Sequence, residues 1–233
     1  ADHIGGIDGL ARHYPCRIYA PHKEKYDFNH EAVRDNQIIH LDNLQLSLEV
    51  LEVPGHTLGH VAYYGANSLF CGDTLFGAGC GRLFEGTPAQ MFSTLQKLAQ
   101  LPANTQIYCA HEYTERNLQF ALTVEPNNPA LLSRIEQTHA LRMTGKPSLP
   151  SSMAMELSTN PFLRCDSDEI AKRMYVMPSS KEAYEEFLSK YQICHVFHYV
   201  SNKKKRWLVK EWKDKGIFVG RVAGHLVAIH DGN

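Results

Sequence analysis

Short apolar runs separated by turn residues fill the first 110 positions of the chain, and this pattern predicts β-strands. Alternating or continuous apolar residues mark strands at 17–20, 37–41, 44–53, 61–64, 68–71 and 105–109. Turn residues interrupt them at 42–43, 54–55 and 65–67. Between these strands we expect residues 22–36 to form a polar loop and residues 77–81 to form a flexible loop.

Apolar residues at helical spacing become frequent after residue 86. We expect helices at 7–11, 88–101, 114–124, 129–143 and 153–157, with a last helical turn at 166–172. Thr87 is placed to cap the second of them, because Pro88 follows at its first turn. Strands therefore dominate the first half of the chain, and helices dominate the segment after Tyr113.

The sequence changes character again near residue 174. We expect a helix at 181–191, a strand at 193–200 and a hairpin formed by 217–222 and 226–230. The basic run Lys203–Arg206 lies near two tryptophans, a pattern found in nucleic-acid-binding segments. A short basic run is more often a solvated face, so we expect no nucleic-acid partner.

Composition narrows the possible classes of protein. The chain has 233 residues, of which 43% are hydrophobic and 21% are charged, and these are values of an ordinary globular protein. No apolar run is long enough for a membrane span, and the net charge of -1 offers no field for an anionic surface. Six scattered cysteines without a CxxC pair argue against a disulfide framework, so we expect a cytoplasmic protein.

Histidine and aspartate residues gather where the predicted strands end. Asp73 follows the strand 68–71, His56 follows Pro54-Gly55, His111 follows the strand 105–109, and Asp2 and His3 are adjacent. A buried carboxylate is costly unless it is paired, hydrogen-bonded or bound to a metal. Because His nitrogens and Asp oxygens are zinc ligands in hydrolytic sites, we expect Asp73 to bridge metal ions held by these residues.

Each member of this group also has a simpler interpretation. An isolated histidine is commonly a surface residue or a satisfied core residue, and Asp73 could cap a turn. The order of the motifs favours the metal site. We interpret His60 as a supporting residue rather than as a ligand.

The motifs ADHIGG, PGHTLGH, FCGDTLF, AGCGRLFEG, CAHEYT and NPFLR resemble, in this order, those of the hydroxyacylglutathione hydrolases (glyoxalase II) of the metallo-β-lactamase superfamily. The resemblance covers residues 1–173. It implies an α+β fold: a partial αββα metallo-β-lactamase sandwich at 1–112 and a helical glutathione-binding domain at 113–173. A short α/β tail of unknown role would follow at 174–233.

The resemblance also implies roles for the clustered residues. Asp2, His3, Asp73 and His111 would hold one metal ion, and His56 with Asp73 would hold another, so that Asp73 and Asp2 serve catalysis. The family uses two zinc ions, with iron or manganese as possible replacements. Two earlier histidines of the superfamily motif are not in the chain, and we therefore expect it to bind at most one metal tightly, with impaired activity.

On the substrate side, the resemblance implies contacts to glutathione from Arg82, Tyr113 and Arg164. Arginine suits a planar carboxylate, and Arg164 would be the anion contact. Its alternative role is that of a surface ion-pair partner. Arg82 stands where the family often has Lys, and Phe84 stands where some members have Tyr.

The expected reaction is hydrolysis of a glutathione thioester such as S-lactoylglutathione to D-lactate and glutathione by a metal-bound hydroxide. The partner would be this small molecule alone, the protein a monomer, and its role methylglyoxal detoxification. Two alternatives remain open at this point: a mononuclear iron persulfide dioxygenase of the same superfamily, and a non-catalytic fragment or binding module.

Overall fold

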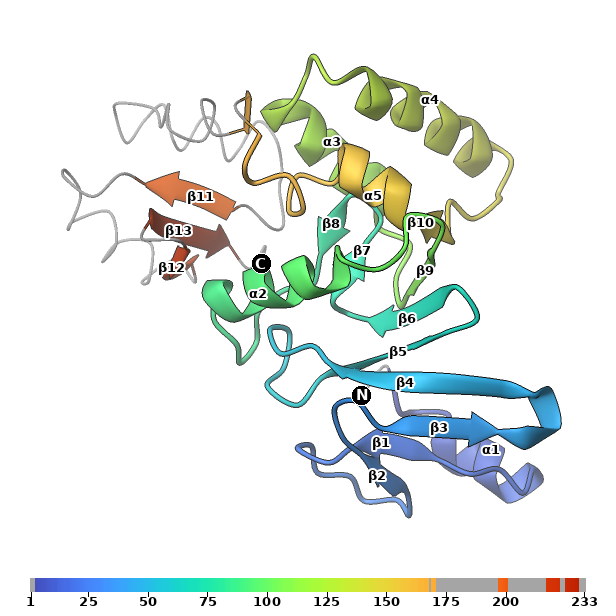
Figure 1. Cartoon of the computed structure of the whole chain (residues 1–233). Helices are drawn as coiled ribbons and strands as arrows, with labels where there is room; N and C mark the ends of the chain where they lie inside the picture. Colours follow the sequence, from blue (N-terminus) through green and yellow to red (C-terminus); the bar gives the residue numbers. More distant parts are fainter. Residues whose placement is uncertain (1–2, 168, 171–196, 201–216, 223–224, 231–233) are drawn as a thin grey trace.

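The fold is taken from a computed structural model, which describes residues 3–167, 169–170, 197–200, 217–222 and 225–230 (Figure 1). Its main element is a six-stranded sheet with the order β10-β9-β6-β5-β4-β3. These strands are β3 (Ile38–Leu41), β4 (Leu46–Glu52), β5 (Val61–Gly65), β6 (Ser68–Gly72), β9 (Gln106–Cys109) and β10 (Ser151–Ser152). Neighbouring strands are antiparallel except β6 and β9, which are parallel. Asp73 and His111 therefore follow the carboxyl ends of two adjacent parallel strands and lie on the same side of the sheet's end.

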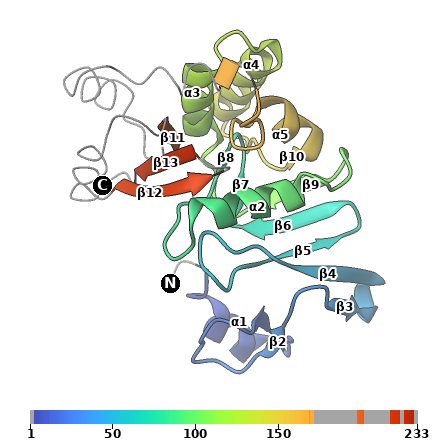
Figure 2. The same ribbon diagram turned by 60° about the vertical axis from the view of Figure 1, so that its left-hand side comes forward.

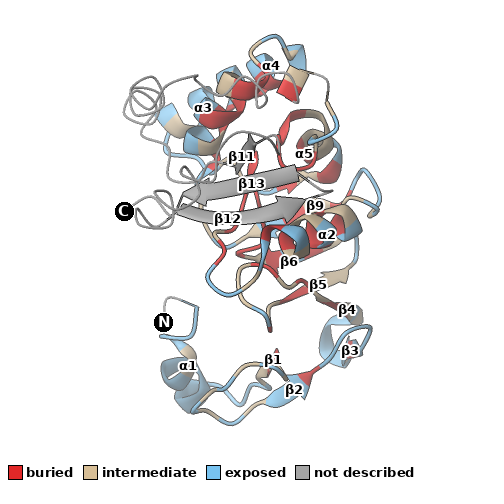
Figure 3. Cartoon of the chain, turned by 90° about the vertical axis from the view of Figure 1, so that its left-hand side faces the viewer, coloured by how far each residue is buried: buried red, intermediate tan, exposed pale blue. Residues whose placement is uncertain are grey.

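The described part of the chain contains five α-helices besides this sheet. They are α1 (Ile7–His13), α2 (Pro88–Leu98), α3 (Thr114–Val124), α4 (Pro129–Met143) and α5 (Met153–Thr159). Thr87 and Gln90 form a capping box at the start of α2, as the Thr-Pro pair predicts. Asn128 caps α4 through the backbone amides of Ala130 and Leu131. Helix α1 has no buried residue, and Figure 3 shows it exposed below the sheet.

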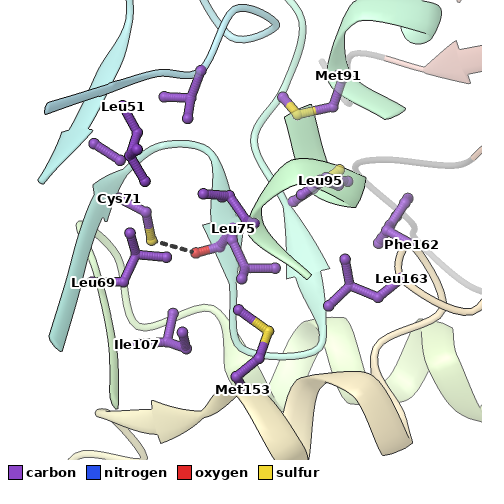
Figure 4. Packing of buried hydrophobic residues seen from close by; sticks show 14 of the residues in the cluster. Leu51, Leu69, Cys71, Leu75, Met91, Leu95, Ile107, Met153, Phe162 and Leu163 are labelled. Atoms are coloured by element: carbon purple, nitrogen blue, oxygen red, sulfur yellow. Dashed lines mark hydrogen bonds between the residues drawn. The ribbon is translucent and has the colours of Figure 1, made fainter. Parts of the chain in front are cut away.

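The hydrophobic core lies between α2 and one face of the sheet (Figures 3 and 4). Leu69 and Cys71 of β6 point into this core, whereas Phe70 between them is exposed and stacks on Tyr108 of β9. This alternation is the two-residue period of a strand. Helix α2 contributes fully buried residues such as Met91. The apolar side of β6 thus fixes the strand from which Asp73 emerges.

Two short sheets lie outside the main one, and both differ from the sequence prediction. Strands β1 (Tyr19–Pro21) and β2 (Glu31–Val33) pair in parallel, within the region expected to be a polar loop. Val33 explains the difference, because it is fully buried beside Ile39, Val50 and Val61. Strands β7 (Leu75–Phe76) and β8 (Gly79–Cys80) form a buried hairpin where a flexible loop was expected.

The expected strand at 44–53 starts two residues later, because Asp42–Leu44 forms the 3₁₀ helix η1. Near the end of the chain, β11 (Phe197–Val200), β12 (Ile217–Val222) and β13 (His225–His230) form a sheet of order β11-β13-β12, with β12 beside α2 (Figure 2). The predicted hairpin is confirmed there. The helix expected at 181–191, most of the turn expected at 166–172 and the basic run at 203–206 lie outside the described residues.

The described helices include none that is long and apolar enough to cross a membrane. The α+β class that the sequence predicts is confirmed. The domain limits at 112 and 173 stay predictions.

Candidate metal centre

Asp73 lies at the centre of three imidazoles that come from three separate segments of the chain. The Oδ2 atom of Asp73 is 2.8 Å from Nε2 of His3 and 3.2 Å from Nε2 of His56. The Oδ1 atom is 3.2 Å from Nε2 of His111. The sequence predicts this grouping of Asp73 with His3, His56 and His111. The remaining predicted ligand, Asp2, precedes His3 and lies outside the described residues.

The donor atoms of His3, Asp73 and His111 all lie within 4.8 Å of one another, a spacing that a single metal ion can bridge. Asp73 is only 6% exposed, and its Oδ1 atom lies at ion-pair distance from His111 but accepts no hydrogen bond among the described residues. A buried carboxylate oxygen without a donor is unfavourable unless a cation satisfies it. Nitrogen and carboxylate donors are a zinc-type set, so these residues fit a metal ion.

The contacts between the carboxylate and the imidazoles shift the pKa values of both. Burial works to raise the pKa of Asp73, but hydrogen bonds and charge from His56 and His3 outweigh it and lower the pKa to about 2. Asp73 is therefore ionised at neutral pH. Burial works to lower the pKa of His56, and the contacts with Asp73 and the Arg82 carbonyl raise it. Asp73 thus supplies a negative charge beside the imidazole nitrogens, and a metal ion bound there would displace the His56 proton that this charge favours.

A second segment of chain holds His56 in place. The Nδ1 atom of His56 lies 2.6 Å from the carbonyl oxygen of Arg82. Because a carbonyl only accepts, Nδ1 carries the proton and Nε2 faces Asp73, the orientation that ligating histidines use. The backbone N–H groups of Phe84 and Glu85 donate to the carbonyl of His56, and the Glu85 side chain accepts from Leu58 N–H at 2.9 Å.

His60 supports the main chain of Asp73. Its Nε2 atom accepts a hydrogen bond of 3.2 Å from the Asp73 backbone N–H. Gly72, the last residue of β6, has φ +51, and a Cβ there would lie 2.7 Å from His60 Nε2. Glycine is required for both reasons. Burial, followed by the charge of His56, lowers the pKa of His60 and keeps it neutral, as an acceptor must be.

The predicted substrate residues divide into two groups. Tyr113 is exposed and stacks on His111, with ring centroids 5.0 Å apart and planes 11° from parallel. The Arg82 guanidinium lies 4.3 Å from the ring centre of Phe84, which itself packs against His56. Both therefore lie beside the metal centre.

Arg164 forks onto Glu125, with Nε and Nη2 at 2.7 and 2.8 Å from its two carboxylate oxygens. Its Nη1 atom donates to the Leu157 carbonyl at 3.2 Å. This ion pair is the alternative role that the sequence left open. The anion-contact role of Arg164 stays a prediction.

Several supporting residues were not found from the sequence. Glu24 accepts from the Thr57 hydroxyl at 2.7 Å, and Glu112 accepts from the backbone and hydroxyl of Ser148. Glu112 directly follows His111 and therefore ties the end of β9 to the loop before β10. The adjacency of Glu112 to a predicted ligand was the available signal. Glu24, in a polar stretch far from the motifs, offered none.

Comparison with known proteins agrees with this geometry. The metallo-beta-lactamase superfamily model matches residues 1–111, and the model of the hydroxyacylglutathione hydrolase C-terminus matches residues 112–204. Hydroxyacylglutathione hydrolase of Pseudomonas paraeruginosa is 51% identical over 175 residues, which are 74% of this chain and 67% of that protein. The chain belongs to the hydroxyacylglutathione hydrolase family.

Other members of the hydroxyacylglutathione hydrolase family are similarly close. The protein from Methylobacillus flagellatus is 63% identical over 164 residues, and that from Shewanella halifaxensis is 50% identical over 177. The chain spans 66% and 69% of these two proteins, about two thirds of their length. The solved structure of the B3 metallo-beta-lactamase BLEG-1 matches with a TM-score of 0.50 and 20% identity, over 70% of this chain and 72% of that one. That likeness shows the fold.

Proposed function

We propose that the chain hydrolyses glutathione thioesters at a metal centre built on Asp73. The observation that carries this proposal is the buried Asp73 carboxylate facing three imidazole Nε2 atoms, in a chain of the hydroxyacylglutathione hydrolase family. Relatives that are 50–63% identical bear the name of that activity. Membership of the superfamily implies a metal, and we propose zinc, because the donors are imidazole nitrogens and a carboxylate.

A bound zinc ion supplies Lewis acidity, which polarises a carbonyl group and makes water available as a nucleophile near neutral pH. The protein's part is to fix the donors. Asp73 supplies the negative charge, His3 and His111 approach it from opposite carboxylate oxygens, and the Arg82 carbonyl keeps His56 from rotating. Preorganised groups of this kind need no rearrangement during the reaction.

Arg82 and Tyr113 are the substrate contacts that we propose. Arg82 carries a positive charge beside His56, and glutathione carries two carboxylates. Tyr113 presents a hydroxyl group beside His111 and is 46% exposed, so its hydroxyl can reach a ligand. The leaving group is a thiolate, which needs little protonation because its thiol is fairly acidic. Water and the thioester thus give a 2-hydroxy acid and glutathione.

We also propose that the protein works as a monomer in the cytoplasm. Five cysteines of the described residues, Cys16, Cys71, Cys80, Cys109 and Cys165, are free thiols, which is typical of a reducing compartment. Light scattering on the purified protein tests the monomer. A mass of two chains would contradict it.

Thioester hydrolysis and persulfide oxidation can be separated in one preparation. The zinc-loaded protein should release D-lactate from S-lactoylglutathione, and the Asp73→Asn variant should not. The iron-loaded protein should consume no oxygen with glutathione persulfide. Oxygen uptake without thioester hydrolysis would favour the dioxygenase. The absence of both reactions would favour a binding module.

A further inference from the structure

The tip of the β7–β8 hairpin is held by side chains of α3, of α5 and of the residue that follows α5. The backbone N–H of Ala78 donates to Glu156 Oε2 at 2.8 Å, and the Gly79 carbonyl accepts from Asn160 Nδ2 at 2.9 Å. The Gly77 carbonyl accepts from Asn117 Nδ2 of α3 at 2.9 Å. Three successive residues of one turn are therefore each bound by a different side chain. This turn contains Ala78 at φ +54, a conformation that needs support in a residue other than glycine.

A fully buried ion pair stands behind these contacts. Glu156 of α5 is 0% exposed, and Arg134 of α4 is 3% exposed. Arg134 Nη2 lies 2.6 Å from Glu156 Oε1, and its Nη1 donates to the Thr159 hydroxyl. Glu156 Oε2 also accepts from Asn160 Nδ2 at 3.0 Å. Burying two charges costs about as much as their attraction returns, so stability alone does not explain the pair.

The hairpin connects the two halves of the metal centre. Asp73 immediately precedes it, and Arg82, whose carbonyl orients His56, closely follows it. The two ends are joined by the Gly81 N–H, which donates to the Thr74 carbonyl at 3.0 Å. A Cβ on Gly81 would lie 1.6 Å from the Asp73 carbonyl oxygen, so the chain segments are in direct contact there. A shift of the hairpin would therefore move Asp73 and the Arg82 carbonyl together.

We propose that Glu156, supported by Arg134 and Asn160, is a positioning residue for the metal centre. It clamps the hairpin tip and so fixes where Asp73 and the Arg82 carbonyl lie relative to His3 and His111, which come from other segments. Glu156 acts through the backbone and is not itself a ligand. This inference rests on the proposed metal centre but not on the choice of substrate.

The test compares Glu156→Gln with Glu125→Gln. Both variants remove a buried carboxylate from an arginine ion pair in the helical part of the chain, and only Glu156 contacts the hairpin. Zinc affinity is measured by competition with a chelator, and the visible spectrum of the cobalt-loaded protein reports ligand geometry. We expect Glu156→Gln to weaken zinc binding about tenfold or more, as loss of outer partners does, and to change the spectrum. Glu125→Gln should change neither.

A double variant, Arg134→Met with Glu156→Met, keeps the test decisive if the single variant unfolds. Replacing both charges by apolar groups commonly preserves stability, yet it still removes the acceptor of Ala78 N–H. Weakened zinc binding in a stably folded double variant supports the proposal. Unchanged affinity and spectrum in a folded variant overturn it, and so does a wild-type chain that binds no zinc. If the variants lose affinity but the wild type hydrolyses no thioester, only the proposed function fails.

Discussion

The Nδ1 atom of His56 lies 2.6 Å from the carbonyl oxygen of Arg82, a residue 26 positions later in the chain. This contact directs the opposite ring nitrogen toward Asp73, at 3.2 Å. The segment after Asp73 therefore returns to support the histidine that precedes it. His56 and Asp73 lie on separate loops, and the β7–β8 hairpin fixes their relative position because it runs from Asp73 to the Arg82 carbonyl.

Gly81 marks the closest approach within this arrangement. In a Gly81→Ala variant the new Cβ would meet the Asp73 carbonyl at 1.6 Å, a backbone atom that cannot move aside. We expect a loss of folding free energy at the upper end of the range of ~1–3 kcal/mol for overpacking, together with weaker zinc binding. Gly9→Ala is the matched control, because nothing lies within 4 Å of its Cβ. Chemical denaturation measures the free energy of unfolding of the two variants. Equal stability of Gly81→Ala and Gly9→Ala would contradict the close approach.

We expect replacement of Arg82 to affect substrate binding and replacement of Arg164 to affect stability. Removing Arg82, which lies beside Phe84 and His56, should raise KM for the thioester about tenfold, the size of a hydrogen bond to a charged group. Arg164→Ala should chiefly reduce stability, because its guanidinium is engaged by Glu125. Steady-state kinetics of both variants decide. A raised KM in Arg164→Ala alone would place the anion contact at Arg164.

Glu125 should make the stability of the protein depend on acid pH. Burial works to raise the pKa of Glu125, but hydrogen bonds from Arg164 and Ser167 outweigh it and hold the pKa below its ordinary value of 4.5. The unfolded chain therefore binds a proton more readily. The stabilisation is present above pH 4.5 and is lost as the pH falls through the lower pKa of the folded state.

The Glu125→Gln variant should be less stable at neutral pH by roughly 2 kcal/mol and should show a weaker acid dependence. Glu115→Gln, which changes an exposed carboxylate in the first turn of α3, serves as the control. Urea unfolding at several pH values gives the dependence of the unfolding free energy on pH for the wild type and for the variant. Parallel curves for wild type and Glu125→Gln would contradict the assignment.

The sequence predicted the β6 strand and the grouping at its end for a physical reason. Leu69 and Cys71 alternate with an exposed residue, and an aspartate after such a strand cannot be accommodated without a partner. His56 and His111 could be placed because each directly follows a recognisable turn or strand. Local pattern was sufficient wherever the residue lies next to a regular element.

Other features depend on contacts between distant segments, which a local pattern does not contain. The sequence of strand β2 predicts a polar loop, because Val33 is its only buried residue. Glu156 stands in an ordinary helical segment, and its role emerges only when Ala78, 78 positions earlier, is seen to donate to it. The pairing of Arg164 with Glu125, over 39 positions, belongs to the same class.

Asp73 is proposed to hold the metal on which thioester hydrolysis depends, and this role can be measured as the rate of S-lactoylglutathione hydrolysis by zinc-loaded Asp73→Asn. Asparagine keeps the size of the side chain and removes its charge, so the fold should persist, and a circular dichroism spectrum checks this. We expect zinc binding to weaken by about 100-fold or more, beyond the loss of an outer partner, and hydrolysis to disappear. Hydrolysis at the wild-type rate by the folded variant would exclude Asp73 as a ligand of the catalytic metal.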